Sequence, residues 1–289
     1  MAALRGVVVG CGHMGTFHAR KLAARPDVDL LGVVDPDAGR DEFPRTGLDQ
    51  ALDFAVVATP TAVHVQTALP LLERGVPCIV EKPLGASAEL AAQLAVFPQV
   101  SVNHVERYNP ALAALPAGVR PHYLRAERIG VFHGRGTDVD VVLDLMIHDL
   151  DLVLHLSGGE ITELRAVGVP VVTDGVDIAE AWVETSTGCV ATLTASRVSR
   201  APKRVLRVVA DEAYWSLDLG QRQAARVDWR AGELGAVPES VTPSDALESL
   251  HRDFLAAVRG ERPYPVPGHE ALAAVEAAER VAAAIAARR

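Results

Sequence analysis

The fold is decided by the stretch Val7-Val8-Val9-Gly10-Cys11-Gly12-His13-Met14-Gly15, in which a short apolar run passes directly into glycines with G-x-G-x-x-G spacing. This order predicts a strand, a tight turn and a helix. Gly10 permits the turn, Gly12 leaves room for a pyrophosphate, and Gly15 lets the helix pack closely on the strand. The free N–H groups at the helix N-terminus would bind the anion.

An acidic residue follows at the distance that this fingerprint requires. The apolar run at residues 30–34 ends in Asp35, about 20 residues beyond Gly15, where a carboxylate would bind the ribose hydroxyls. We therefore expect a dinucleotide site rather than a strand–helix turn that binds nothing. The charges of Asp35 and Asp37 would repel a 2′-phosphate and favour NAD, whereas Arg40 keeps NADP open as an alternative.

The composition limits the class of protein. A chain of 289 residues is long enough for two domains. Its formal net charge of -9 argues against a general surface for nucleic acid or anionic membranes. The three cysteines match no metal or redox spacing, the start lacks the pattern of a signal peptide, and no apolar run is long enough to span a membrane. We therefore expect a cytoplasmic protein with reduced thiols.

Three more apolar runs, at residues 54–58, 78–80 and 100–102, predict further buried strands of a parallel sheet. Ligands of such sheets bind beyond the carboxyl ends of the strands, so Thr59, Lys82 and the Gly10 turn should line one crevice. A surface lysine at a strand end is an equal alternative for Lys82 on position alone.

Two helices should follow the third and fourth strands. In the first, Val65, Leu69 and Leu72 have helical spacing and should face the sheet, while Pro70 would kink the helix or mark a restart. In the second, Ser87 is the expected N-cap.

The strongest helical pattern of the second half covers residues 140–156 and has two stripes. One stripe is apolar (Leu143, Ile147, Leu150 and Leu154), and its neighbour is ionisable (Asp144, His148, Asp151 and His155). The ionisable stripe has three interpretations. It could be a solvated face, a metal site, or an acid/base pair in which Asp144 orients the imidazole of His148; the last is favoured because imidazole titrates near neutral pH.

Beyond this helix the pattern changes to a series of strands, at residues 162–172, 178–185, 189–197, 204–211 and 214–219. An exposed loop is expected at 232–245, followed by helices at 246–259 and 268–288. The sequence thus predicts an α/β Rossmann N-terminal domain, residues 1–104, and an α+β C-terminal domain with an open, mostly antiparallel sheet, residues 105–289.

Four motifs together resemble the Gfo/Idh/MocA oxidoreductases. They are the glycines, Ala58-Thr59-Pro60 with His64, Glu81-Lys82-Pro83, and Asp144-x-x-x-His148. The resemblance covers about the first 157 residues. It implies hydride transfer between NAD(P) and a sugar or polyol carbon, with NAD as the expected cofactor, no nucleic acid or membrane partner, and a homo-oligomer (dimer or tetramer) formed through the C-terminal sheet.

The resemblance also implies residue roles. Lys82 and His148 match the family's catalytic lysine and histidine, and Asp144 matches its acidic partner in substrate binding. The expected cofactor-binding residues are Gly10, Gly12, His13, Met14, Gly15, Asp35, Thr59, Pro60, His64, Glu81 and Lys82.

Within the family, residues 103–110 and 143–151 are most similar to the UDP-N-acetylglucosamine 3-dehydrogenase branch, which makes Arg107 and Asn109 candidates for binding the nucleotide-sugar. The chain departs from typical members in its short connections after Asp35 and Ser87. A dehydrogenase of inositol or a free monosaccharide, a non-catalytic NAD-sensing regulator and a metal-dependent hydrolase remain as alternatives.

Overall fold

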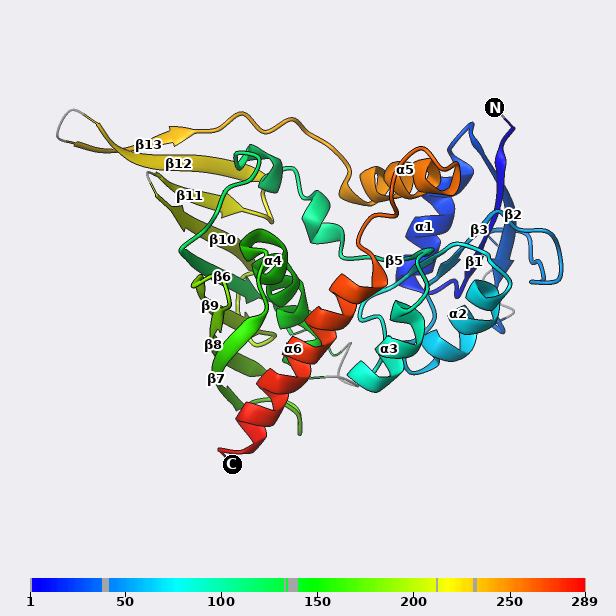
Figure 1. Cartoon of the computed structure of the whole chain (residues 1–289). Coiled ribbons are helices and arrows are strands. Elements are labelled where there is room, and N and C mark those ends of the chain that lie inside the picture. Colours follow the sequence, from blue (N-terminus) through cyan, green and yellow to red (C-terminus); the bar gives the residue numbers. More distant parts are fainter. Residues whose placement is uncertain are drawn as a thin grey trace. The chain divides into compact units, whose positions relative to one another are not determined.

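The computed structural model describes residues 2–37, 42–132, 134, 140–211, 213–230 and 233–288, so Arg40 lies outside the described residues. The chain forms two compact units (Figure 1). The first comprises Met1–Val105 and Leu247–Leu272, and the second comprises Glu106–Ala246 and Ala273–Arg289. A single boundary near residue 104 does not describe this division, because the chain returns to the first unit near its end.

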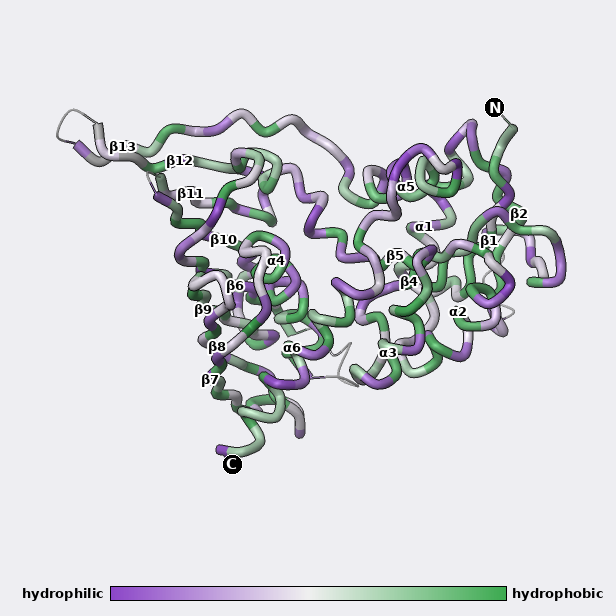
Figure 2. Tube along the Cα trace, viewed as in Figure 1, coloured by the Kyte–Doolittle hydropathy of each residue, from purple (hydrophilic) through white to green (hydrophobic). Residues whose placement is uncertain are grey.

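A five-stranded parallel sheet forms the centre of the first unit, in the order β2-β1-β3-β4-β5. Its strands are β1 (Leu4–Val9), β2 (Val28–Val34), β3 (Phe54–Val57), β4 (Cys78–Val80) and β5 (Val100–Val102). Most of their residues are hydrophobic (Figure 2), and β3, β4 and β5 are buried along their whole length. The strand order reverses between β1 and β3, and this is the position where open α/β sheets bind ligands.

The helices of the first unit are α1 (His13–Ala23), the 3₁₀ turn η1 (Thr61–Val63), α2 (His64–Glu73), α3 (Ala88–Ala95) and α5 (Ala246–Val258). As predicted, Ser87 caps α3, its hydroxyl accepting a hydrogen bond from the Leu90 N–H at 3.2 Å. Helix α5 belongs here because Phe254, which is fully buried, packs edge-on against Phe54 of β3, with 6.1 Å between the ring centroids.

Helix α2 differs in detail from the predicted pattern. Pro70 lies inside a continuous helix, where it is exposed. The buried face is formed by His64, Ala68, Leu71 and Leu72, whereas Val65 and Leu69 are only half-buried. Of the three residues expected on the buried face, Leu72 alone is fully buried, because the buried side of the helix runs through Ala68 and Leu71 instead of Val65 and Leu69.

An eight-stranded sheet dominates the second unit, in the order β13-β12-β11-β10-β6-β9-β8-β7. All neighbours pair antiparallel except β6 and β9, which pair parallel. The strands are β6 (Tyr123–Ile129), β7 (Ile161–Val169), β8 (Ile178–Thr185), β9 (Val190–Ser196), β10 (Lys203–Ala210), β11 (Ala213–Asp218), β12 (Gln223–Arg230) and β13 (Glu233–Pro238). The predicted fold class is therefore confirmed.

Three of these strands were not predicted. β13 occupies part of the expected loop at 232–245, and its interpretation as a loop was wrong because β13 pairs with β12 along its whole length. Strand β6 lacks the alternation of polar and apolar residues that predicts a strand. Two of its charged residues, Glu127 and Arg128, are buried, and each forms an ion pair.

The remaining helical elements are η2 (Val105–Tyr108), η3 (Leu112–Ala114), a π-helical turn (Val142–Met146), α4 (Ile147–Ser157) and α6 (Gly268–Ala286). Helix α4 contacts β6 and β9 in the second unit (Figure 1). Among the described residues, no helix is long and apolar enough to cross a membrane. Cys11, Cys78 and Cys189 are buried free thiols.

Candidate functional site

The turn after β1 has the geometry that its glycines predict. Gly10 has φ +88°, and a Cβ atom there would lie 2.6 Å from the carbonyl oxygen of Ala58. A Cβ atom on Gly15 would lie 1.9 Å from the carbonyl oxygen of Gly10. Both positions therefore require glycine, and the close packing brings the start of α1 against the end of β1.

The N-terminus of α1 and Asp35 face this turn. Gly12 is the N-cap of α1, and no acidic residue occupies the first turn. The Asp35 carboxylate accepts a hydrogen bond from the Cys11 N–H at 2.6 Å and another from the Asp37 N–H at 2.8 Å. The turn thus combines helix N–H groups suited to a pyrophosphate with a fixed carboxylate suited to ribose hydroxyls.

His13 and Met14 start α1. His13 is exposed, and its ring lies edge-on to Phe17 at 4.9 Å between centroids; Met14 is half-buried. Their contact with the cofactor stays a prediction.

The end of β3 carries Thr59, Pro60 and, one turn later, His64. Thr59 Oγ1 is buried without a hydrogen-bond partner among the described residues, as expected for a polar atom that faces a ligand. Pro60 is exposed. His64 is 1% exposed, and its two ring nitrogens lie 2.9 Å from the carbonyl oxygens of Thr59 and Pro83. Burial lowers the pKa of His64. The histidine thus connects the ends of β3 and β4.

Beyond β4, the motif Glu81-Lys82-Pro83 has a cis peptide bond between Lys82 and Pro83. Lys82 is half-buried. Glu81 is 8% exposed and accepts hydrogen bonds from His18 and Asn103. The Glu81 side chain is therefore engaged within the first unit, and its contact with the cofactor stays a prediction.

In the second unit, Asp144 lies in the π-helical turn, and His148 lies in the first turn of α4. Both residues are half-buried. Single π-helical turns occur frequently at functional sites, because the extra residue changes which side chains share a face. Because of this π-helical turn, Asp144 does not have the regular α-helical spacing from His148 on which the predicted ionisable stripe depends.

The rest of the stripe serves other purposes. His155 is exposed. Asp151 is 1% exposed and forms a bidentate ion pair with Arg107, with Oδ–N distances of 2.6 and 2.9 Å. Arg107, predicted to bind the substrate, thus holds α4, and its substrate contact stays a prediction.

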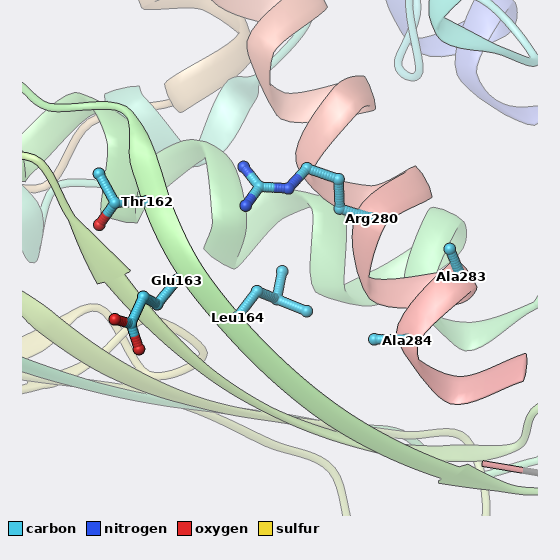
Figure 3. Close-up of a pocket in the computed structure, with 6 residues that line it drawn as sticks. All are labelled: Thr162, Glu163, Leu164, Arg280, Ala283 and Ala284. Atoms are coloured by element: carbon cyan, nitrogen blue, oxygen red, sulfur yellow. The ribbon is translucent and has the colours of Figure 1, made fainter. Parts of the chain in front are cut away.

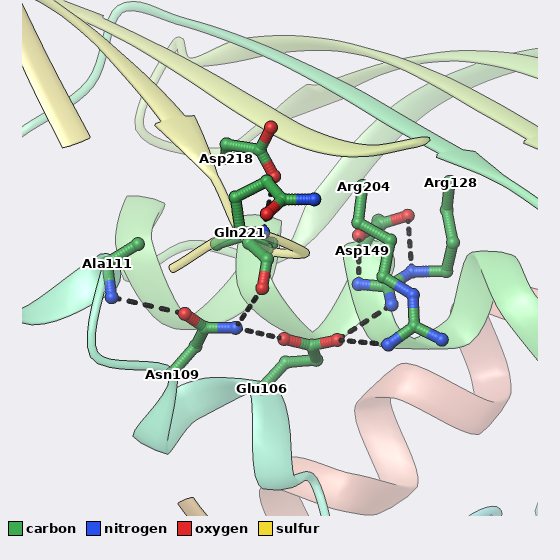
Figure 4. A network of polar contacts seen from close by, with 9 residues as sticks. Glu106, Asn109, Ala111, Arg128, Asp149, Arg204, Asp218 and Gln221 are labelled. Carbon is green, nitrogen blue, oxygen red and sulfur yellow. Dashed lines mark hydrogen bonds and ion pairs between the residues drawn. The ribbon is translucent and has the colours of Figure 1, made fainter. Parts of the chain in front are cut away.

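A second ion pair holds the same helix (Figure 4). Arg128 of β6, which is 4% exposed, donates two hydrogen bonds to Asp149 and one to Glu106. Burial raises the pKa of Asp149, and Arg128 offsets this only in part. Asp149 and Asp151 follow His148 by one and three residues. Their ion pairs with Arg128 and Arg107 therefore hold in place the helix that carries His148.

Asn109 completes this network (Figure 4). Its amide nitrogen donates to Glu106 and to the carbonyl of Leu219, and its oxygen accepts from the N–H of Ala111. These contacts use the amide's hydrogen-bonding groups within the unit, at 8% exposure. Binding of the nucleotide-sugar by Asn109 stays a prediction.

The second unit contains a pocket whose lining includes none of these residues (Figure 3). It is open to solvent between β7 and α6, and it is lined by Thr162, Glu163, Leu164, Arg280, Ala283 and Ala284. In the part of the chain that the structure describes, no group of three or more His, Cys, Asp or Glu residues is arranged to hold a metal ion.

Sequence reasoning missed His18, His251 and Arg128. His18 and His251 lie 233 residues apart, and their hydrogen bond follows from the packing of α5 on the first unit, which no local pattern predicts. Arg128 lies in a strand that was not recognised. The ion pair of Arg128 is indicated in the sequence only by the acidic residues of α4, which need cationic partners once they are buried.

Comparison with known proteins gives matches in both units. Residues 4–98 match the oxidoreductase family with an NAD-binding Rossmann fold, and residues 124–216 match the GFO/IDH/MocA C-terminal domain. UDP-N-acetylglucosamine 3-dehydrogenase from Acidithiobacillus ferrooxidans is 38% identical over 95% of this chain and 96% of its own length.

A crystal form of that enzyme superposes with a TM-score of 0.90 at 35% identity and covers 99% of both chains. Inositol 2-dehydrogenase from Arthrobacter sp. is 27% identical over 56% of each chain.

Proposed function

Because this chain belongs to the Gfo/Idh/MocA family of NAD-binding oxidoreductases, we propose that it oxidises a sugar hydroxyl with NAD, and that the hydroxyl is the one on C3 of a UDP-N-acetyl-hexosamine. The observation that carries this proposal is the extent of the similarity to UDP-N-acetylglucosamine 3-dehydrogenase. It covers 95% of the chain and hence both units, at 38% identity.

The first unit fits the cofactor. The N-terminus of α1 would bind the pyrophosphate, and Asp35, held by the Cys11 N–H, would accept hydrogen bonds from the ribose hydroxyls. The unpartnered Thr59 hydroxyl lies at the neighbouring strand end. When bound, NAD supplies the acceptor for the hydride.

The preference for NAD over NADP follows from charge. The carboxylate of Asp35 would repel a 2′-phosphate. The described arginine beside it is Arg45, whose guanidinium is hydrogen-bonded to the backbone carbonyls of Asp35 and Asp37. Arg45 is thus already occupied by the backbone, which supports NAD as the working cofactor.

Lys82 and His148 are assigned to the chemical step. His148 accepts the proton of the substrate hydroxyl as its carbon is oxidised, and Asp144 contributes to binding the substrate. The positive charge of Lys82 stabilises the negative charge that develops on the same oxygen, an effect worth a few kcal/mol, roughly 2–4, in a site that excludes water.

Two alternatives have weaker support. A dehydrogenase of inositol or a free monosaccharide shares the core motifs, but the inositol enzyme of Arthrobacter matches only 56% of the chain. A non-catalytic NAD-sensing regulator would bind NAD equally well, yet it would have no need of the Lys82 and His148 pair.

We further propose that the protein is a homo-oligomer and is located in the cytoplasm. The edge strand β7 exposes Val167 and Val169, at 47% and 45%, which supports a homo-oligomer through the eight-stranded sheet. Three free, buried thiols are compatible with a reducing compartment, the cytoplasm. Light scattering of the purified protein tests the assembly, and a monomer at working concentration would contradict it.

The function is tested by following NADH absorbance with a panel of substrates. The panel contains UDP-N-acetylglucosamine, its uronic acid, myo-inositol and free hexoses. The proposal predicts turnover of a UDP-N-acetyl-hexosamine, whereas turnover of inositol alone would establish the first alternative. NAD binding without turnover of any member would favour the regulator.

Lys82→Ala and His148→Ala are the matched variants for the chemical step. Each should lower kcat by at least about a hundredfold while NAD affinity stays near that of the native protein. Unchanged turnover in both variants would remove the two residues from the mechanism.

A further inference from the structure

Two buried histidines of the first unit contact each other directly. His18 lies in α1 and His251 lies in α5, and both are 0% exposed. His18 Nδ1 and His251 Nε2 are 2.7 Å apart, so one nitrogen donates a hydrogen bond to the other. Neither residue belongs to the four motifs that identify the family.

The other ring nitrogen of His18 contacts Glu81. His18 Nε2 lies 2.9 Å from Glu81 Oε1, and the Asn103 amide donates to the same oxygen at 2.7 Å. The N–H of Lys82 lies 3.3 Å from Glu81 Oε2. Both carboxylate oxygens are therefore fixed, one by side chains from α1 and the end of β5, and the other by the backbone of Lys82.

The positions of the protons follow from these contacts. A carboxylate only accepts hydrogen bonds, so His18 Nε2 must donate to Glu81. If His18 is neutral, its Nδ1 accepts a hydrogen bond from His251 Nε2. His251 Nδ1 then keeps a lone pair, and it is buried without a partner among the described residues. Burial and the neighbouring His18 lower the pKa of His251 well below its ordinary value, in keeping with a neutral ring.

Glu81 is ionised in this environment. Burial raises its pKa, but the hydrogen bonds from His18 and the Asn103 amide and the charge of Lys82 outweigh burial, so the pKa of Glu81 lies below its ordinary value. The other titratable groups facing this cluster are His64, which interacts with Glu81, and Lys21 and Arg25, which interact with His251.

We propose that His18, held in one orientation by His251, is a positioning residue that keeps Glu81 an oriented carboxylate beside Lys82, so that the negative charge of Glu81 acts on the Lys82 ammonium group and places it for its reaction. This rests on the proposed function for the role of Lys82 in turnover. The effect on Lys82 itself follows from contacts within one unit and requires no substrate.

The direct experiment measures the reactivity of the Lys82 amine. Competitive acetylation with acetic anhydride at a series of pH values, followed by mass spectrometry of the full-length protein, gives the pH of half-maximal labelling at each lysine. Lys203, which lies in the second unit, is the internal reference. The variants are Glu81→Gln, His18→Leu and His18→Gln, with Ser101→Ala as the matched control.

Glu81→Gln removes the charge without changing the shape, and it should lower the labelling midpoint of Lys82 by about one pH unit. His18→Leu removes the donor and should lower it in the same direction. His18→Gln restores an N–H donor and should bring the midpoint back toward the native value. Ser101→Ala removes a buried hydroxyl that has no partner among the described residues, and should have no effect.

Turnover supplies a second readout. Glu81→Gln and His18→Leu should lower kcat about tenfold or more with little change in the KM of the sugar substrate, and His18→Gln should recover part of the loss. An unchanged Lys82 midpoint in Glu81→Gln would overturn the proposal, and so would equal midpoints in His18→Leu and His18→Gln. If His18→Leu does not fold, Glu81→Gln decides. Failure of the proposed function would instead appear as absent turnover with the predicted midpoint shifts intact.

Discussion

Arg107 donates two hydrogen bonds to the carboxylate of Asp151, with the arginine side chain 7% and the aspartate side chain 1% exposed. The bond joins η2 to α4, the helix that carries His148. Removing one partner takes the bidentate ion pair away from a charge that stays buried, which costs far more than removing both.

We therefore predict that Arg107→Ala or Asp151→Ala lowers the free energy of unfolding by about 3–5 kcal/mol, as measured with urea. The double variant Arg107→Met with Asp151→Leu should regain most of this loss. A fully stable Arg107→Ala protein with a raised KM would show instead that Arg107 serves mainly to bind substrate.

Substitution of a glycine in the turn after β1 can be compared with substitution of Gly75, which lies outside that turn. Gly15→Ala places a Cβ atom 1.9 Å from the carbonyl oxygen of Gly10, so α1 must move away from the turn. NAD affinity should fall at least about tenfold, and stability by about 1–3 kcal/mol. Gly75 has a positive φ, +80°, and a Cβ atom there would meet nothing within 4 Å. Gly75→Ala should therefore cost only about 1 kcal/mol and leave NAD binding unchanged.

Asp35 provides a test of cofactor choice. Asp35→Ala removes the acceptor for the ribose hydroxyls and should weaken NAD binding about 10- to 100-fold, the cost of losing hydrogen bonds to a charged group. Binding of NADP should improve relative to NAD, because the repelling charge is gone. Titrations with both cofactors measure the ratio, and an unchanged ratio would exclude Asp35 from the choice.

A pH-dependent prediction concerns Asp177 of the second unit. This buried carboxylate accepts hydrogen bonds from the N–H groups of Val171, Val172 and Thr173, at 2.7, 2.7 and 2.9 Å. Although burial raises the pKa of Asp177, these bonds lower it well below its ordinary value of 3.8. A depressed pKa stabilises the fold above the unfolded-state value, and the stabilisation is lost as the pH falls.

The native protein should therefore exceed Asp177→Asn in stability by about 1–3 kcal/mol above roughly pH 5. The difference should shrink as the pH falls below 3.8. Urea unfolding of both proteins from neutral to acid pH measures it. A difference that is constant across this range would contradict the assigned role of the carboxylate.

The first unit could be predicted from its sequence because local patterns carry most of its information. Apolar runs gave the five parallel strands, and the spacing from Gly10 to Asp35 gave the turn and the carboxylate that the structure brings within 2.6 Å of it. The return of α5 to this unit could not be predicted, since it depends on the contact of Phe254 with Phe54, about 200 residues earlier.

The second unit was harder because its charged residues are buried in pairs. A stripe of Asp and His in a helix looks the same whether it lines a site or binds arginines from other elements. The structure separates the two cases: Asp151 pairs with Arg107, while His155 is exposed. The π-helical turn that carries Asp144 has no sequence signature that we recognise.

The central claim is that hydride leaves C3 of the sugar for NAD. The most direct measurement uses UDP-N-acetylglucosamine deuterated at C3, with mass spectrometry of the NADH formed. We predict NADH that carries one deuterium, and its loss in Lys82→Ala and His148→Ala. Unlabelled NADH, or none with any UDP-N-acetyl-hexosamine, would contradict the claim.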